Sequence, residues 1–180
     1  MAQVLAPAAV ADDAPVDLKT LALGSRQTIA GMVYGTIMVL AALTAGAKAF
    51  QDDLWELGAV VTTTVLVLWF AHVYSHGLGE SLELGRRLTL EELGSIARRE
   101  LSIVLAAALP LAFLLLGAMG VFEGRTAIWL AFGVGVATLT VQGIRFALLE
   151  QLTVVGTIVT VALNISLGLA IVALKVLVAH

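Results

Sequence analysis

Cysteine is absent from this chain, and charged residues are scarce. Only 13% of the 180 residues are Asp, Glu, Lys or Arg. Without cysteine there are no disulfides, no thiolate metal ligands and no cysteine nucleophile. Soluble domains carry about 25% charged residues, so this composition excludes an ordinary water-soluble domain. The ten basic residues are dispersed and the net charge is −3, which excludes a nucleic-acid-binding surface of the usual basic kind.

Hydrophobic runs make up most of the remaining sequence. Five of them contain no Asp, Glu, Lys or Arg and hold 21, 23, 22, 19 and 24 residues: 27–47, 57–79, 101–122, 126–144 and 151–174. At about 1.5 Å per helical residue, each run is long enough to cross a hydrocarbon core of about 30 Å. Lipid offers no hydrogen-bond partners to the backbone, so a spanning segment must be a helix or part of a closed barrel. The sequence therefore predicts an all-α protein, a polytopic transmembrane helix bundle with five spans.

The basic residues predict the orientation of this bundle. Five spans put the two termini on opposite sides of the membrane. Seven basic residues then lie on the N-terminal side and three on the other: Lys19, Arg26, Arg86, Arg87, Arg98, Arg99 and Arg145 against Lys48, Arg125 and Lys175. Basic residues accumulate in cytoplasmic loops. We therefore expect a cytoplasmic N-terminus, an external C-terminus and a multi-pass protein of the bacterial cell membrane.

Two segments fall outside the spans. Residues 1–25 are Ala-rich and lack the basic start and apolar core of a signal peptide, which predicts a retained, mobile tail before a transmembrane domain at 26–180. Residues 80–100 form an amphipathic cytoplasmic loop, in which Thr89 and Glu92 have the spacing of a capping box. The helix that they begin is expected to run straight into the third span. Pro110 predicts a kink there, because it has no N–H for the carbonyl of Ala106.

Arginines at both ends of this loop predict contact with lipid. Arg86, Arg87, Arg98 and Arg99 would lie at the inner headgroup level and attract anionic lipid headgroups. The alternative is an ordinary basic membrane boundary. The expected partners are thus the lipid bilayer and further copies of the chain, because five short spans enclose little space. Nucleic acid is not expected.

Small and polar residues share helical faces in three of the spans. Glycines at steps of about four residues favour close helix packing, and they are Gly31, Gly35, Gly135, Gly156 and Gly168. Polar side chains continue the same faces at Gln142, Arg145 and Asn164. Packing is one interpretation of these faces, and a hydrated path lined by the polar side chains is the other.

The second span ends in a stripe of ionisable residues. His72, His76 and Glu80 are four apart and share one helical face, and Tyr34 of the first span is expected to meet them. Ionisable residues at membrane depth suggest a function, and histidine titrates near neutrality. Interfacial packing, a proton or cation route, and a metal site are the three alternatives. Because His72 and Glu80 lie about 12 Å apart along a helix, we predict no metal and no cofactor.

Three functions follow from these alternatives. The first is a small ion or proton transport or channel protein that works as a homo-oligomer through Tyr34, His72, His76, Glu80 and the polar residues of the fourth and fifth spans. The second is a structural or accessory membrane subunit that docks through the loop 80–100. The third is a membrane metalloprotein that uses His72 and His76. Nothing in the sequence predicts an enzyme.

Two family resemblances accompany these patterns. The segments Tyr34-Gly-Thr-Ile37 and Trp69-Phe-Ala-His-Val-Tyr-Ser-His76 resemble those of small bacterial multi-pass membrane proteins with no assigned activity. The stretches Ala127-Ile-Trp-Leu-Ala-Phe-Gly-Val-Gly135 and Leu174-Lys-Val-Leu177 fit the same group. The aromatic and histidine cluster is also similar to that of bacterial relatives of the lysosomal potassium channel. Their Phe-Ser-Asp motif is replaced here by Gly31-Met-Val-Tyr-Gly35, so their selectivity filter is not implied.

Overall fold

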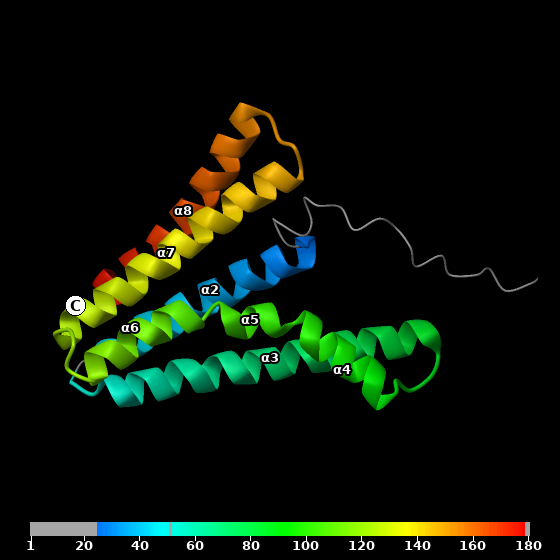
Figure 1. Cartoon of the computed structure of the whole chain (residues 1–180), viewed down its shortest axis with the longest axis horizontal. Coiled ribbons are helices and arrows are strands. Elements are labelled where there is room, and N and C mark those ends of the chain that lie inside the picture. The colour runs from blue at the N-terminus through cyan, green and yellow to red at the C-terminus, as the bar shows by residue number, and fades with distance from the viewer. Residues whose placement is uncertain (1–24, 51, 179–180) are drawn as a thin grey trace, which may run out of the picture.

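The computed structural model describes residues 25–50 and 52–178, and this part of the chain is helical with no strand. The predicted tail 1–25 therefore lies outside the described residues, apart from Ser25. Figure 1 shows the helices in order: α2 (Arg26–Gly46), α3 (Leu54–Leu84), α4 (Leu90–Arg99), α5 (Leu101–Leu105), α6 (Ala108–Ala118), α7 (Gly124–Leu149) and α8 (Val154–Val178).

Four of these helices, α2, α3, α7 and α8, are long and apolar enough to cross a membrane. The segments Leu90–Leu105 and Ala108–Ala118 supply a fifth if the bent pair is one span. The prediction of an all-α protein built from apolar, membrane-length helices is confirmed. The described chain has four such helices, or five when the bent pair is included.

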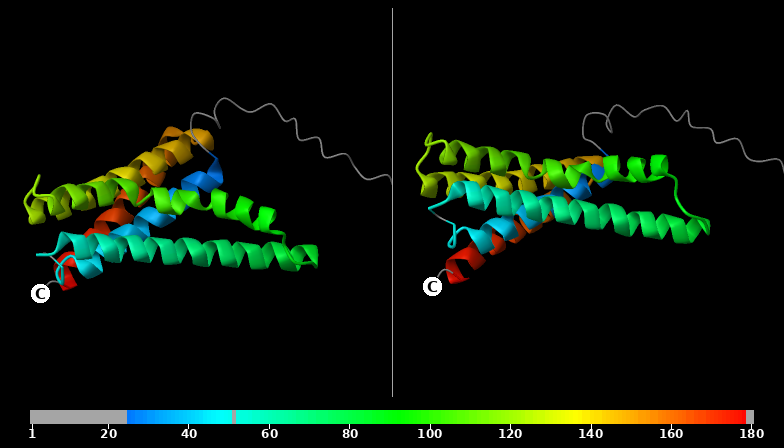
Figure 2. Two further views of the ribbon diagram at one scale, coloured as in Figure 1. Left: turned by 60° about the horizontal axis from the view of Figure 1, so that its bottom comes forward. Right: turned by 90° about the horizontal axis from the view of Figure 1, so that it is seen from below.

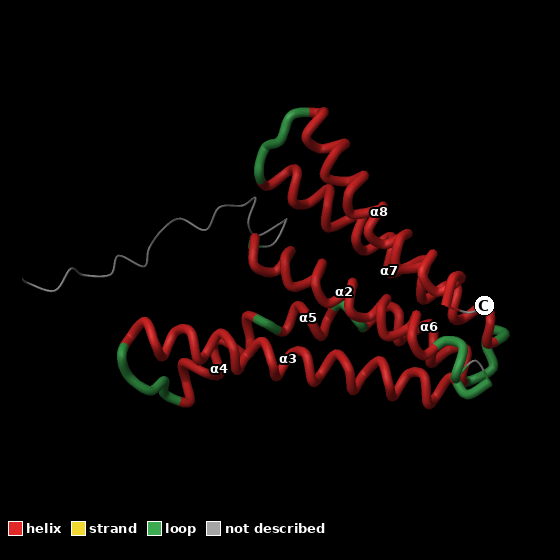
Figure 3. The backbone as a smooth tube through the Cα atoms, turned by 180° about the vertical axis from the view of Figure 1, so that it is seen from behind, coloured by secondary structure: helices red, strands yellow, loops and turns green. Residues whose placement is uncertain are grey.

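The helices converge at one end and separate at the other (Figure 1). The loops after α2 and after α6 lie at the converging end. At the opposite end α2 begins, α3 ends, and α7 turns into α8; Figure 3 shows this last turn as a loop far from the α3–α4 connection. We call the end at which the helices separate the basic end, because six of the described arginines flank it: Arg26, Arg86, Arg87, Arg98, Arg99 and Arg145. Figure 2 shows that α3 and α4 reach beyond the start of α2 there.

Apolar side chains fill the core of the converging half. The buried set comes from α2, α3, α6 and α7, and it includes Val39, Leu40, Leu43, Leu57, Val61, Leu114, Phe132 and Leu139. The buried polar residues are Thr36, at the middle of α2, and Glu100, Ser102 and Gln142, which lie nearer the basic end. Three of these four buried polar residues are therefore found in one half of the described bundle.

Local hydrogen bonds explain where the helices begin and end. The hydroxyl of Ser25 accepts from the Thr28 N–H and starts α2, and Asp53 does the same for α3 through Glu56. Thr89 and Glu92 form the predicted capping box of α4, which is confirmed. Gly85 ends α3 with a φ of 63°, a left-handed conformation that glycine adopts without strain.

The third apolar run is bent. Its two parts meet at an angle of 50° at Ala106 and Ala107. Pro110 lies four residues after Ala106. Proline has no N–H to donate to the Ala106 carbonyl, and its ring would clash with that carbonyl in a straight helix. The predicted kink is confirmed. The helix that begins after Thr89 does continue into this run, but not as one regular helix, because it is already interrupted at Glu100.

Candidate functional site

The interruption between α4 and α5 places Glu100 inside the bundle. Glu100 is only 4% exposed, although it lies one residue before the charge-free run. The indole N–H of Trp69, on α3, donates to the carbonyl of Ala97 at 3.1 Å and fastens the end of α4 to α3. This bond uses a carbonyl close to the break. The α4–α5 junction is thus held against α3, with the carboxylate turned inward.

Glu100 is held by side chains from two other helices. Its Oε1 lies 2.9 Å from Nδ1 of His76 on α3. The amide of Gln27, on α2, donates to the same oxygen at 3.2 Å. A buried carboxylate is costly unless it is paired and hydrogen-bonded, and these two contacts meet that need. The side chain of His76 is 50% exposed, so the pair connects the surface with the interior.

Two aromatic rings extend this arrangement toward the middle of the bundle. The ring of His72 lies 6.0 Å from that of His76 and 4.6 Å from that of Tyr34 on α2. Nδ1 of His72 lies 3.3 Å from the carbonyl of Leu68. A carbonyl only accepts hydrogen bonds, so this contact requires a proton on Nδ1 and leaves Nε2 available. We call Gln27, Tyr34, His72, His76 and Glu100 the His–Glu cluster.

Glu80, the third residue of the predicted stripe, faces a different partner. Its Oε1 lies 2.8 Å from Nη2 of Arg99, so it joins α3 to α4 rather than to the histidines. The structure therefore brings His72 and His76 together with Tyr34 and Glu100, while Glu80 belongs to the α3–α4 hairpin.

A second ion pair closes that hairpin. Arg86 donates to both carboxylate oxygens of Glu92, at 2.6 and 3.1 Å. This hydrogen bonding, together with the backbone N–H of Thr89, holds the pKa of Glu92 down at about 2, and the same carboxylate raises the pKa of Arg86. The side chains of Arg86 and Glu92 are 51% and 35% exposed, and both residues precede the apolar run that begins at Leu101. The pair orders the turn between α3 and α4.

Gln142, Arg145 and Asn164 lie on the other side of α2. Gln142 is 3% exposed, and its Oε1 accepts from Arg145 at 3.3 Å. Asn164 donates to the carbonyl of Thr160 at 3.0 Å. Gln142, Thr160 and Asn164 line a cavity of about 430 Å³ between α2, α7 and α8, and Tyr34 lines it too. Tyr34 is the residue common to this cavity and the His–Glu cluster.

The glycines assigned to packing have different surroundings. A Cβ on Gly31 would overlap the hydroxyl of Ser102, and one on Gly35 would lie 2.5 Å from the carbonyl of Ile103, so α2 and α5 are in close contact. A Cβ on Gly135 would meet Leu40 of α2, and one on Gly168 would meet Leu139 and Val136 of α7. Gly156 faces only Leu152 and Thr153, its own neighbours in sequence.

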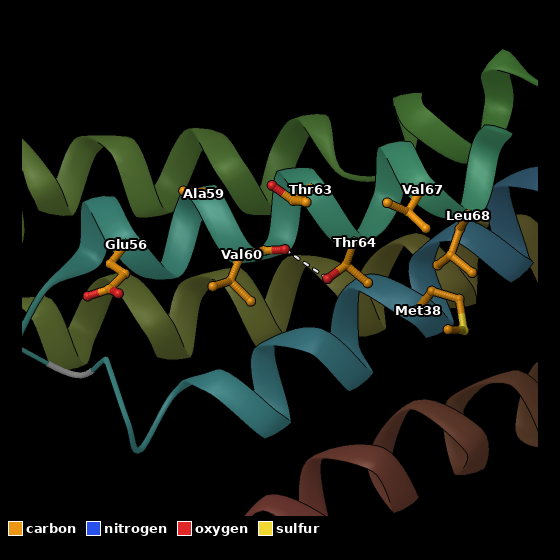
Figure 4. A pocket seen from close by; sticks show the side chains of 8 residues that line it. All are labelled: Met38, Glu56, Ala59, Val60, Thr63, Thr64, Val67 and Leu68. Carbon is orange, nitrogen blue, oxygen red and sulfur yellow. Dashed lines mark hydrogen bonds between the residues drawn. The ribbon is translucent and has the colours of Figure 1, made fainter. Parts of the chain in front are cut away.

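A second cavity, of about 640 Å³, lies along α3 on the face toward Met38 of α2 (Figure 4). Its lining is mainly apolar. The hydroxyl of Thr64 donates to the carbonyl of Val60 within the same helix, and Glu56 stands at one end. This cavity has no convergence of polar groups comparable to that at the basic end.

The His–Glu cluster brings a phenol, two imidazoles and a buried carboxylate together in the order Tyr34, His72, His76 and Glu100, and groups of these kinds are suited to proton exchange. Within residues 25–50 and 52–178, no group of three or more His, Asp or Glu residues is arranged to hold a metal ion.

Sequence reasoning missed Glu100 and Gln27. Glu100 was assigned to the cytoplasmic loop, yet it is spaced four residues after Ile96 and three before Ile103, both of which are buried. That spacing puts the three side chains on one helical face. A carboxylate on the apolar face of a helix was the available signal.

Comparison of the chain with protein-family models, with curated proteins and with solved structures finds no match in any of the three.

Proposed function

We propose that the chain is a small membrane transport protein for protons, which enter and leave through the His–Glu cluster and cross the membrane in a homo-oligomer. The observation that carries this proposal is the pair formed by buried Glu100 and half-exposed His76. Histidine changes its charge between pH 5 and 8. A proton taken up by His76 from water can therefore be passed to a carboxylate that water does not reach directly.

The positive-inside rule supports an orientation for this site. Six described arginines flank the basic end, against Lys48 and Arg125 near the converging end. In the proposed five-span topology the basic end faces the cytoplasm and the C-terminus lies outside. The side chains of Arg87 and Arg98 are exposed there and are suited to anionic lipid headgroups.

A homo-oligomer is part of the proposal because one copy offers no complete polar route among the described residues. Beyond Tyr34 the buried core is apolar except for Thr36, whose hydroxyl bonds to the Met32 carbonyl of its own helix. Only 6% of the most apolar stretch of α8 is buried against the other helices, so α8 presents a long surface to lipid or to another copy. Copies that meet through such surfaces would line the remaining half of the path together.

The test is proton flux into vesicles that contain the purified protein and a pH-sensitive dye. The proposal expects flux that rises with the imposed pH difference and is sensitive to His76→Gln. Ala137→Gln, at an exposed position on α7 outside the cluster, is the control and should retain the flux. No flux at any pH between about 5 and 8, the range in which histidine titrates, contradicts the proposal.

A second candidate function has its own supporting observation. The α3–α4 hairpin reaches beyond the other helices and carries Leu82, Leu84 and Leu90, which are 74%, 54% and 88% exposed. Exposed leucines outside the apolar runs suit a protein surface on which another membrane subunit docks. Under this alternative, Arg98→Glu and Leu90→Ser abolish the cellular function while His76→Gln leaves it intact. The reverse pattern favours proton transport.

A further inference from the structure

The cavity between α2, α7 and α8 has features that proton transport does not use. Its walls are largely apolar, formed by Ile29, Ala30, Val33, Ile37 and Phe146. Tyr34, Gln142 and Asn164 add polar groups to the same lining. A cavity of about 430 Å³ lies within the range of about 300–1,000 Å³ that is typical of small-molecule sites, where a few polar groups orient an apolar ligand.

The two amides in this lining have defined orientations. Arg145 only donates, so the Gln142 atom that it contacts must be the oxygen. The carbonyl of Thr160 only accepts, so the Asn164 atom that bonds to it must be the nitrogen. Gln142 therefore has its NH₂ group free to donate, and Asn164 has its carbonyl oxygen free to accept.

Three polar groups of the lining have no hydrogen-bond partner in the described chain. The NH₂ of Gln142, the oxygen of Asn164 and the hydroxyl of Tyr34 make no hydrogen bond to any of residues 25–50 or 52–178. Gln142 is only 3% exposed as a whole residue, and Ser102 Oγ is the one fully buried polar atom without a partner in the described chain, so the Gln142 nitrogen keeps surface that opens into the cavity. Polar groups that face an apolar cavity without a partner are costly, and a ligand that bonds to them there removes that cost.

The nearby charges are already compensated. Arg26, which also lines the cavity, pairs with Glu150 at 2.7 Å. Arg145 bonds to Gln142 and does not line the cavity. A fully charged ligand would thus find no free counter-charge among the described lining residues. The polar groups on offer besides Arg26 are neutral: the Gln142 donor, the Asn164 acceptor and the hydroxyls of Tyr34 and Thr160.

We propose that this cavity binds an uncharged amphipathic molecule whose head carries both a hydrogen-bond acceptor and a donor, such as a long-chain amide. The acceptor of the head takes the Gln142 NH₂, and its donor binds the Asn164 oxygen. The hydrocarbon chain lies along the apolar residues of α2 and Phe146. The site shares Tyr34 with the His–Glu cluster but contains neither its histidines nor Glu100, and the proposal stands whether or not the protein transports protons.

The test uses a photoreactive ten-carbon primary amide, a matched ten-carbon hydrocarbon without a head, and the full-length protein in lipid vesicles. Mass spectrometry locates the cross-links. Ala30→Trp fills the cavity from α2, and Ala41→Trp is its control, at an exposed position on the same helix outside both cavities. Asn164→Leu removes the acceptor at nearly constant volume. Thr138→Val is its control, because that hydroxyl bonds to its own helix at Val134.

The proposal expects the amide to label cavity-lining peptides at least about fivefold more than the hydrocarbon, the smallest effect expected for one unpaired buried polar group. It expects Ala30→Trp and Asn164→Leu each to lower amide labelling by a similar factor, and the two controls to leave it unchanged. Equal labelling by the two probes, which would mean that lipid chains fill the cavity without selection, overturns the proposal. Amide labelling that survives Asn164→Leu also overturns it. Because Asn164→Leu keeps the volume of the side chain, it decides the question even if Ala30→Trp prevents folding.

Discussion

Glu100 and His76 come from different helices and meet at 2.9 Å, with the carboxylate buried and the imidazole half exposed. Gln27 completes the set from a third helix. The contact depends on a break in a helix, on the bond from Trp69 to Ala97, and on the close approach of α2 to α5.

The first prediction concerns the contact between α2 and α5. In Gly35→Ala the new methyl group would lie 2.5 Å from the carbonyl of Ile103, a backbone atom that cannot move aside alone. Overpacking of this kind costs about 1–3 kcal/mol. We expect that loss in the free energy of unfolding, measured by circular dichroism in detergent with increasing denaturant.

Gly133→Ala is the matched control for this loss. It also lies in an apolar helix, but a Cβ there meets nothing within 4 Å. Alanine is a better helix former than glycine by up to about 1 kcal/mol, so Gly133→Ala should be neutral or stabilising. Equal destabilisation by the two variants would show that the α2–α5 contact is looser than described.

The second prediction concerns the bend in the third apolar run. Pro110→Ala restores an N–H for the carbonyl of Ala106 and should straighten the helix. The arms Leu90–Leu105 and Ala108–Ala118, about 24 and about 16 Å long at 1.5 Å per residue, meet at 50°. Straightening would lengthen the distance between spin labels at Glu91 and Val121 by about 4 Å. An unchanged distance in Pro110→Ala would mean that packing, rather than the proline, imposes the bend.

The third prediction concerns the pH dependence of the hairpin turn. The hydrogen bond from Arg86 lowers the pKa of Glu92 from 4.5 to about 2. Because the folded pKa lies below the unfolded one, the contribution of the pair to stability is complete above about pH 4.5 and is lost as the pH falls toward 2. The N–H of Thr89, 2.7 Å from Glu92, reports this step. Its NMR shift should stay constant from pH 7 to pH 4 and move only below that.

Arg86→Met tests the cause of this shift. Without the guanidinium, the movement of the Thr89 signal should begin at a higher pH. In Glu92→Gln the signal should not move at all over the same range. A midpoint that is the same in wild type and Arg86→Met would show that Arg86 does not set the pKa of Glu92.

Much of the fold could be predicted from the sequence, because membrane helices need long charge-free runs and nothing else in a chain produces them. The spacing of Thr89 and Glu92 predicted the start of a helix, and Pro110 predicted a bend, because both effects depend only on residues close in sequence. His72 and His76 were also found, because their spacing of four is a property of one helix.

The partner of these histidines could not be predicted in the same way. Glu100 lies 24 positions after His76 in the sequence, and Gln27 lies 73 positions before Glu100. Their meeting depends on how α4 folds back along α3 and where α5 crosses α2, which no single helix encodes. The free amide groups of Gln142 and Asn164 were hidden for the same reason, because only their neighbours fix which atom faces the cavity.

Proton flux in vesicles that contain Glu100→Gln tests the central claim most directly. The amide keeps the shape of the carboxylate but cannot carry its proton. Glu91→Gln is the control, because Glu91 is exposed on α4 and lies outside the cluster. If Glu100 and His76 carry the proton, flux in Glu100→Gln falls to the rate of protein-free vesicles while Glu91→Gln matches the wild type. Wild-type flux in folded Glu100→Gln would contradict the account.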